Sequence, residues 1–431
     1  MKKTIYTFAI IMLIMAFTNK AFSHKIKVWG DNSFAQGGFG VNVPTTSKVP
    51  TNIASNSPST DFTAWAYIAS GDYHVLAIHN NGTLWGWGKN DAGQLGDANV
   101  ANKVFPTQIA ASTWISVAGG YGHTIAVRSD GTLWGCGYNL YSQVGDGSSI
   151  NKTSFTQIGT ATNWKSVACG EFFSLGLKTD GSLWGWGQNF NGQLGDANTN
   201  PKLIPTQIGA DKDWAFIECG GYHSLAIKTD GSLWAWGNNL NGQTNGTSTS
   251  NKTAPTQIGT DKDWATATGG LSHSLFIKTN GSLYALGFNN FGQLGDNTTG
   301  DKKVLTLIAP GTTFSSVSAG CYHTIAVSTC GALYGWGYNP NGQVGDNTTT
   351  NRTVPTPIGT NVYWSSVAAG YTHSVAVGVN PSLAVPQVYD VTCTPIGTMT
   401  DNAGTTITER GFVWSLSTTS TSPTYTVCLQ N

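Results

Sequence analysis

The chain has 431 residues, of which 39% are hydrophobic and only 10% are charged. Its 22 Lys and Arg residues balance its 22 Asp and Glu residues, so no net field favours the phosphate backbone, and a nucleic-acid partner is not expected. The 54 glycines, interspersed with Asn, Thr and Ser, indicate many tight turns and argue for an all-β protein of short strands.

Residues 1–23 have the pattern of a secretory signal peptide. Lys2 and Lys3 precede an apolar run from Ile5 to Phe17, which is too short to span a bilayer comfortably, and the segment ends in a cleavable Ala-x-Ser pattern. We therefore predict an exported protein that is secreted, periplasmic or at the cell surface, with no integral membrane segment after cleavage near His24. The alternative is a retained anchor, but no stop-transfer pattern follows.

A repeat of about fifty residues occupies residues 24–380. The segment Gly181-Ser-Leu-Trp-Gly-Trp-Gly187 recurs with its first glycine at Gly82 and then 49 or 50 residues further on each time, as far as Gly331. Each unit has a Trp, a strand of small residues, Gly-x-x-His, an apolar strand, an Asp-Gly or Asn-Gly turn, the Trp-Gly-Trp-Gly strand, a Gly-Gln-Leu-Gly-Asp loop and a short last strand. The Asp-Gly turns predict two-residue hairpins with positive φ at both central residues.

Four short strands per unit, apolar on both faces, suit blades that stack around an axis. The Gly-x-x-His slot occurs seven times, with Phe173 in place of His once, and the Trp-Gly to Gln half also occurs seven times. The chain starts with the second half, at Trp29, and its repeats end with the first half, from Gly370 to Val377. We therefore predict an all-β fold, a seven-bladed β-propeller closed by a split blade shared between the N-terminal and C-terminal repeat halves, which leaves no exposed sheet edge.

The motif Gly-Gly-x-x-His-[Ser/Thr]-Leu-Ala, followed by Leu-Trp-x-Trp-Gly-x-Asn-x-x-Gly-Gln-Leu-Gly, resembles the regulator of chromosome condensation repeat. The resemblance covers roughly residues 25 to 380 and all seven units. Members of that family include a nucleotide-exchange factor for a small GTPase, a plant ultraviolet photoreceptor and secreted β-lactamase inhibitors. They share a protein-binding face and not one activity, so the resemblance implies a binding scaffold.

Residues 381–431 lack the repeat and are rich in Thr and Ser. The run Glu409-Arg-Gly-Phe-Val-Trp-Ser415 resembles the opening strands of the immunoglobulin- or fibronectin-like modules of bacterial surface proteins. Such a sandwich needs roughly twice this length. The segment is therefore predicted to be an incomplete module, the end of a truncated gene product, or a linker with two strands packed on the propeller.

The seven cysteines include no Cys-x-x-Cys pair, which argues against zinc and thioredoxin-like sites. Cys169 and Cys219 occupy the same slot in neighbouring repeats, and Cys393 and Cys428 share the C-terminal segment. Either pair could form a disulfide in an oxidising compartment.

The repeat helps to distinguish structural residues from catalytic ones. A residue type that is present in every blade is most simply explained by packing and turn formation, which every blade requires, whereas the residues of an active site should differ from the repeat. The repeat histidines are therefore expected to bond to backbone between blades, and the Trp residues to fill the space between blades. The Asp residues that end the Gly-Gln-x-Gly-Asp loops are expected to cap turns, since Pro201 and Gln207 replace the Gly and Glu of a calcium loop. We predict no catalytic, cofactor-binding or metal-binding residue, and that the protein is not an enzyme.

The two residues between Gly and His differ from blade to blade, and they begin the same strand in each blade, so they should form a ring at one mouth of the central channel. The predicted partner-binding residues are Asp72, Tyr73, Tyr121, Glu171, Phe172, Tyr222, Leu271, Tyr322 and Tyr371. Six of them are aromatic, which is typical of interface hot spots. The alternative is that the tyrosines only rim the channel with solvated hydroxyls.

We therefore expect a monomeric scaffold that docks a protein or surface glycan on this ring. One alternative is a propeller hydrolase or lyase that uses Asp72 and Glu171. Another, implied by the family resemblance, is guanine-nucleotide exchange, which fits poorly with a signal peptide.

Overall fold

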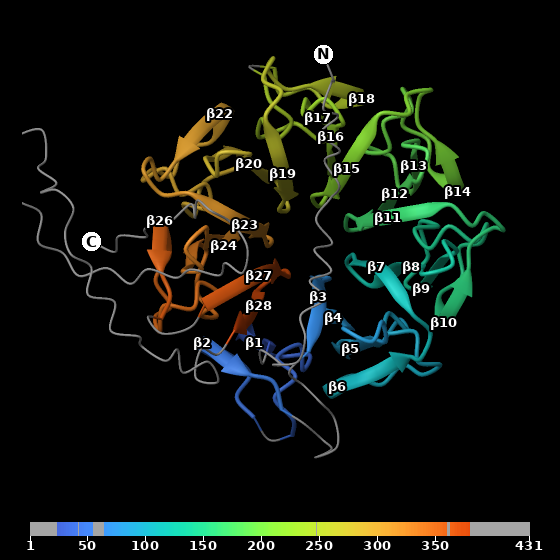
Figure 1. Cartoon of the computed structure of the whole chain (residues 1–431), viewed down its shortest axis with the longest axis horizontal. Coiled ribbons are helices and arrows are strands. Elements are labelled where there is room, and N and C mark those ends of the chain that lie inside the picture. Colours follow the sequence, from blue (N-terminus) through green and yellow to red (C-terminus); the bar gives the residue numbers. More distant parts are fainter. Residues whose placement is uncertain (1–23, 42, 55–63, 247, 360–362, 380–431) are drawn as a thin grey trace, which may run out of the picture. The chain divides into compact units, whose positions relative to one another are not determined.

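The computed structural model describes residues 24–41, 43–54, 64–246, 248–359 and 363–379, all within the unit Met1–Asn380. Its regular structure consists of 28 strands in seven four-stranded sheets around a central axis (Figure 1). The predicted all-β seven-bladed propeller is thus confirmed. The predicted signal peptide, residues 1–23, and the segment 381–431 lie outside the described residues. No helix long and apolar enough to cross a membrane occurs in the described ranges.

Every blade has the same antiparallel order from the axis outward. The innermost strands are β3 (Trp65–Ser70), β7 (Trp114–Gly119), β11 (Trp164–Cys169), β15 (Trp214–Cys219), β19 (Trp264–Gly269), β23 (Phe314–Ala319) and β27 (Tyr363–Ala369). The second strands are β4 (His74–His79), β8 (His123–Arg128), β12 (Phe173–Lys178), β16 (His223–Lys228), β20 (His273–Lys278), β24 (His323–Ser328) and β28 (His373–Val379). The third strands are β5 (Leu84–Gly88), β9 (Leu133–Gly137), β13 (Leu183–Gly187), β17 (Leu233–Gly237), β21 (Leu283–Gly287), β25 (Leu333–Gly337) and β1 (His24–Asp31). The outer strands are β6 (Lys103–Ala110), β10 (Lys152–Gln157), β14 (Lys202–Gln207), β18 (Lys252–Gln257), β22 (Lys302–Ile308), β26 (Arg352–Pro357) and β2 (Thr46–Asn52).

Burial in each blade follows this order. The first five residues of β16 are all buried, because a second strand lies inside its own sheet and between two neighbouring sheets. The outer strand β14, in contrast, has no buried residue. The near-continuous apolar run of the second strands is therefore a consequence of blade stacking.

The predicted split blade is present. In the sheet order β2-β1-β28-β27, the N-terminal strand β1 pairs antiparallel with β28 over Lys25–Gly30 and His373–Gly378. Trp29 on β1 is fully buried and its Nε1 donates to the Gln343 carbonyl of the preceding blade at 2.9 Å. Trp186 makes the same bond to Gln143, so the closing blade is joined to the ring in the same way as the others.

The hairpin between second and third strands differs from the prediction. Gly181 has φ of 80°, but Asp180 is not among the residues with positive φ, and Gly181 N donates to the Lys178 carbonyl at 3.0 Å. This is a type I turn followed by a left-handed glycine, not a two-residue turn with both residues left-handed. The reason is the Asp180 carboxylate, which accepts from Ser182 N at 3.1 Å and Ser182 Oγ at 2.7 Å and so holds the turn in this form.

The repeat histidines do lie between blades, but their partner is a hydroxyl and not backbone. His223 Nε2 lies 2.8 Å from Ser274 Oγ in the next blade, and that hydroxyl donates to the Gln243 carbonyl, so Nε2–H is the donor. The equivalent bonds join His74, His123, His273 and His323 to Thr124, Ser174, Thr324 and Ser374. His373 lies instead 2.8 Å from Ser70 Oγ on the inner strand β3, because Val75 occupies the hydroxyl position of that blade. Burial lowers the pKa of His223 to about 3, so the imidazole stays neutral.

Three of the aspartates that end the Gly-Gln-x-Gly-Asp loops cap turns, as predicted, because Asp146, Asp296 and Asp346 accept from the backbone N of Ser148, Thr298 and Thr348 at 3.2, 3.2 and 3.0 Å. In the remaining loops of this type the carboxylate is held by side chains, as at Asp196. Asp196 Oδ1 accepts from Asn189 Nδ2 at 2.9 Å, and its Oδ2 forms an ion pair with Lys202 at 2.8 Å. Hydrogen bonds from Lys202 and Asn189 outweigh desolvation and lower the pKa of Asp196.

The structure tests one of the two predicted cysteine pairings. Cys169 and Cys219 are free thiols, so the first predicted pairing is absent, whereas Cys330 is disulfide-bonded. The alternative pair, Cys393 and Cys428, lies outside the described residues.

Candidate functional site: the aromatic face and the channel

The predicted ring positions meet at one mouth of the channel, where backbone hydrogen bonds connect the blades. Tyr121 N donates to the Glu171 carbonyl at 3.2 Å, Glu171 N to that of Gly221 at 3.1 Å, and Tyr371 N to that of Asp72 at 3.0 Å. The remaining links run from Asp72 to Gly120, Gly221 to Gly270, Leu271 to Cys321 and Cys321 to Tyr371. Seven links close the circle, so the backbone beneath each ring side chain is fixed.

Two acids of the ring lie in an unusual environment. The Tyr222 hydroxyl donates to Glu171 Oε2, but burial still raises the pKa of Glu171. Burial, together with the nearby charge of Glu171, raises the pKa of Asp72 to about 8, although Lys89 acts in the opposite direction. Asp72 Oδ2 is buried and has no hydrogen-bond partner. These carboxyl groups therefore lack the solvation that keeps an ordinary acid ionised.

The aromatic ring residues form a continuous arc over five blades. The ring centroids of Tyr371 and Tyr73 are 5.5 Å apart, and those of Tyr73 and Tyr121 are 6.4 Å apart. The arc continues to Phe172 at 5.2 Å and on to Tyr222 at 6.4 Å. Leu271 follows in the next blade, and Tyr322 belongs to a second aromatic cluster.

Sequence reasoning missed a second set of residues on this surface, the variable positions in Gly-x-Asn-x-x-Gly-Gln. The backbone brings them beside the ring, because the residue after each third strand donates to the carbonyl of the residue before the histidine. Lys89 N, for example, donates to the Tyr73 carbonyl at 2.9 Å, and Tyr338 N to that of Tyr322 at 2.8 Å. The available signal was that these positions vary while their neighbours repeat. We call the combined surface the aromatic face, with residues Phe34, Tyr73, Tyr121, Tyr138, Tyr141, Phe172, Phe190, Tyr222, Phe288, Phe291, Tyr322, Tyr338 and Tyr371.

The contacts within the aromatic face are dense on both sides of the mouth. Tyr141 lies 5.2 Å from Phe172 and 6.2 Å from Phe190, which connects the loops to the arc. On the other side, Phe291 lies 5.3 Å from Tyr322 and 4.7 Å from Tyr338.

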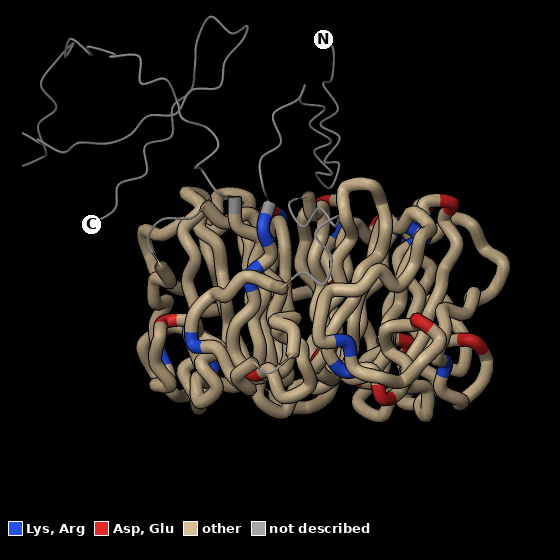
Figure 2. The backbone as a smooth tube through the Cα atoms, turned by 90° about the horizontal axis from the view of Figure 1, so that it is seen from below, with Lys and Arg blue, Asp and Glu red and all other residues tan. Residues whose placement is uncertain are grey.

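Next to the residues of the aromatic face lie the cation of Lys89 and two exposed leucines, which occupy the same loop position as the exposed Phe190 of the face. Lys89 Nζ lies 5.0 Å from the ring of Phe34 and 5.5 Å and 5.6 Å from those of Tyr73 and Tyr121. At the same loop position of three consecutive blades, Leu140, Phe190 and Leu240 are 59%, 58% and 65% exposed. In a side view of the ring, the charged residues of both signs lie scattered along the backbone (Figure 2). Exposed apolar side chains that recur on one face are typical of an interaction surface.

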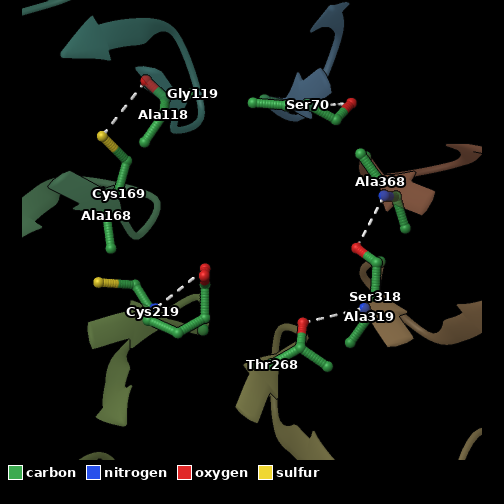
Figure 3. A pocket seen from close by; sticks show the side chains of 18 of the residues that line it. Ser70, Ala118, Gly119, Ala168, Cys169, Cys219, Thr268, Ser318, Ala319 and Ala368 are labelled. Carbon is green, nitrogen blue, oxygen red and sulfur yellow. Dashed lines mark hydrogen bonds between the residues drawn. The ribbon is translucent and has the colours of Figure 1, made fainter. Parts of the chain in front are cut away.

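The inner strands enclose a cavity of about 360 Å³ along the axis (Figure 3). Its wall consists of small side chains and backbone. Side-chain hydroxyls of this wall accept hydrogen bonds from the backbone of the neighbouring inner strand. Ser318 Oγ accepts from Ala369 N at 2.9 Å and Thr268 Oγ1 from Ala319 N at 3.2 Å.

Glu218 is a third acid at this wall, which sequence reasoning also missed when it placed only Asp72 and Glu171 at the channel. Burial raises the pKa of Glu218 to about 7. The sequence signal was present, because Glu218 stands where other blades have Ala, Thr or Ser. In the described ranges no group of three or more His, Cys, Asp or Glu is arranged to hold a metal ion.

A closed propeller with an aromatic, partly exposed face is the architecture of a binding scaffold. Two sequence models described as the regulator of chromosome condensation (RCC1) repeat match the chain, one over residues 81–127, 180–227, 280–327 and 331–377, the other over residues 65–94, 114–143, 164–193, 214–243 and 314–343. Together they cover more than half of the chain, which therefore belongs to this repeat family.

Similar solved structures include Prp20p from Saccharomyces cerevisiae, with 22% identity, a TM-score of 0.76, and coverage of 84% of this chain and 92% of that one. The work on Prp20p also describes its binding to Gsp1p and histones, and a second structure shows Kap60 bound to the same yeast protein. Human WBSCR16 has 21% identity, a TM-score of 0.74, and coverage of 83% of this chain and 99% of that one. At these identities the likeness shows the fold.

A curated relative is the mitochondrial RCC1 domain-containing protein RUG3 of Arabidopsis thaliana. It is 35% identical over 83 residues, which are 19% of this chain. The match spans only 17% of that relative's length.

Proposed function

We propose that this chain is an exported binding scaffold that docks a protein partner on the aromatic face. The observation that carries the proposal is the contiguous aromatic arc flanked by the exposed tips Leu140, Phe190 and Leu240. Large aromatic side chains with exposed apolar neighbours supply the area that a partner can bury at low entropic cost. Family members that bind proteins, such as Prp20p, support the same class of function.

Ring geometry favours a protein over a glycan. The planes of Tyr73 and Tyr121 lie at 84°, and those of Tyr141 and Phe190 at 87°. Such edge-on packing offers a corrugated apolar surface and not the flat platform on which a sugar ring stacks. The exposed leucines gain more from burial against apolar side chains than against a hydroxylated ligand.

Export is supported by the n-region, the short apolar run and the cleavable end of residues 1–23. The test is N-terminal sequencing of the protein recovered outside the cytoplasm of its native host. A mature chain that begins near His24 is the expected result. An intact Met1 on a protein retained in the cytoplasm would refute export.

A photo-crosslinking amino acid at Phe190 tests the docking face in the native envelope or medium. The matched control is the same amino acid at Leu203, which is 54% exposed on the outer strand β14, against 58% for Phe190. Protein crosslinks at position 190 and none at position 203 are expected. Equal crosslinking at the two positions would contradict docking on this face.

Substitution then gives the energetic test once a partner is in hand. The Tyr222→Ala, Tyr322→Ala double variant should weaken binding by about 1 to 4 kcal/mol for each true hot spot. Tyr363→Ala is the control, since Tyr363 is a 47% exposed tyrosine at the start of β27, the end away from the ring. Wild-type affinity in a folded double variant would show that the partner binds elsewhere on the molecule. If the wild type binds to a glycan array and the double variant does not, the ligand of this face is a glycan and not a protein.

A second candidate function rests on the raised pKa values of Asp72 and Glu171, since carboxyls perturbed in this way are common in active sites. A panel of hydrolase and lyase substrates tests it. Turnover that disappears in Glu171→Gln would establish an enzyme. Nucleotide exchange on a small GTPase is tested by the corresponding release assay.

A further inference from the structure

The channel wall repeats from blade to blade except at three positions, one on β3 and two on β15. Counted from the Trp or Phe that begins each inner strand, the fourth following residue is Ala, Thr or Ser in six blades and Glu218 in the seventh. The second following residue is Ser or Thr in five blades, but it is Tyr67 on β3 and Phe216 on β15. Neither packing nor the turns require these exceptions, because the other blades do without them.

The exception at Glu218 adds a third acid to a cavity whose described lining has no cationic residue. Three carboxyl groups line the cavity, those of Asp72, Glu171 and Glu218, and the described lining residues include no Lys, Arg or His. Asp72 Oδ2 is buried without a partner, and Glu218 Oε1 accepts a bond of 3.3 Å from the adjacent Cys219 N. A buried carboxylate oxygen without a donor is costly unless a ligand supplies one.

Burial favours the protonated, neutral form of these acids. Desolvation raises the pKa of Glu218 to about 7, and desolvation with the charge of Glu171 raises that of Asp72 to about 8. The groups that face these acids are Tyr67, Cys169 and Cys219 around Glu218, and Glu171, Lys89, Tyr73 and Cys321 around Asp72. Of these only Lys89 is cationic, and it lies over the aromatic rings at the mouth.

The acids lie at two levels along the axis. Glu218 is the fourth residue after Trp214, whereas Asp72 and Glu171 are the seventh residues after Trp65 and Trp164. Glu218 lies within β15, whereas β3 and β11 end at Ser70 and Cys169, so Asp72 and Glu171 follow the strand ends at the mouth of the channel. A cavity of about 360 Å³ is near the lower end of ligand sites, which suits a thin ligand.

We propose that the channel binds a linear aliphatic polyamine. One ammonium group pairs with Glu218 beside Tyr67 and Phe216, whose rings attract cations, and the other lies at Asp72 and Glu171. The methylene chain between them contacts the small side chains of the wall. The site shares Asp72 and Glu171 with the ring at the mouth, but Glu218 lies outside the aromatic face, so a test at Glu218 is independent of the proposed docking.

The test is calorimetric titration of the full chain with spermidine, beside a Glu218→Ala variant. Alanine occupies the same position in four other blades, so this variant should fold, which thermal melting checks. The control is Thr268→Ala, the same position in the next blade, which removes no charge. Saturable binding by the wild type and by the control is expected, with affinity about tenfold or more weaker in Glu218→Ala, as for loss of a charged hydrogen bond. Equal affinity in the two variants would overturn the proposal.

Two further ligands and the pH dependence sharpen the result. Butylamine has a single ammonium group and can pair with the acids at only one end of the site, so it should bind at least about tenfold more weakly than spermidine. The uncharged 1,8-octanediol can form no ion pair and should not bind. Binding of spermidine should release protons and tighten from pH 6 to pH 8, as the acids ionise. The polyamine site would be refuted if the diol bound as tightly as spermidine, or if spermidine did not bind at millimolar concentration. If butylamine bound as tightly as spermidine, the proposed second ion pair at Asp72 and Glu171 would be refuted.

Discussion

Replacement of His223 by Phe isolates the contribution of one buried imidazole to acid sensitivity. The pKa of this histidine is lowered by burial from 6.5 to about 3. Between pH 6.5 and pH 3 the unfolded chain binds a proton at this site that the folded chain does not bind, so stability falls as the pH falls. From pH 7 to pH 5 the loss is about 2 kcal/mol for one histidine. The variant should therefore lose about 2 kcal/mol less than the wild type over this interval.

The chain itself shows that the substitution is compatible with the fold. Phe173 occupies the same slot, fully buried, and the following blade's Ser224 still donates to the Gln193 carbonyl at 2.7 Å. In His223→Phe, the equivalent Ser274 keeps its bond to Gln243. The raised pKa values of Asp72 and Glu218 act in the opposite direction, but they are common to wild type and variant and cancel in the difference.

Urea unfolding at pH 7 and pH 5 measures the effect. Ser274→Ala is the control, because it removes the same inter-blade bond but leaves the titrating imidazole, so its pH dependence should match the wild type. If His223→Phe and the wild type lose the same free energy between the two pH values, the buried neutral imidazole is not a source of acid sensitivity.

The remaining predictions concern the ring as a whole and one loop. Deletion of Lys25 to Phe39 removes β1 and Trp29 and should destabilise the entire propeller in one transition, because β28 and the neighbouring blade lose their partner; unchanged melting would refute closure as the source of stability. Asn189→Ala removes a buried amide whose Nδ2 donates to Asp196 Oδ1 and to the carbonyls of Asn198 and Asn200, and whose Oδ1 accepts from Leu194 N. This variant should lower the free energy of unfolding, measured with denaturant, by about 2 to 5 kcal/mol. The control Asn241→Ala removes only an exposed side-chain hydrogen bond to Asp301 and should lower it by less than about 1 kcal/mol.

Much of the fold could be predicted because its signals are local and repeated. The period, the Trp-Gly strands and the half-motifs at the two ends determined the blade number and the closing pair β1 and β28. The turn at Asp180-Gly181 was predicted less well, because a dipeptide alone does not show which hydrogen bond the Asp carboxylate makes. The candidate site was predicted in part, since the Gly-x-x-His positions do meet at one mouth, although their role in binding stays a prediction.

The sequence by itself determined a closed, neutral, seven-bladed ring. Each blade is built from the same apolar strands and turns, and the residues that specify them all lie within about fifty consecutive positions. Only the tertiary structure decided which side chains meet between blades. It places Ser274 beside His223, Phe190 beside Tyr141, and Glu218 with Tyr67 on the same cavity wall. Residues at one sequence position in neighbouring blades become contacts only when the ring closes, and the charge of the channel depends on acids from three blades that no single repeat contains.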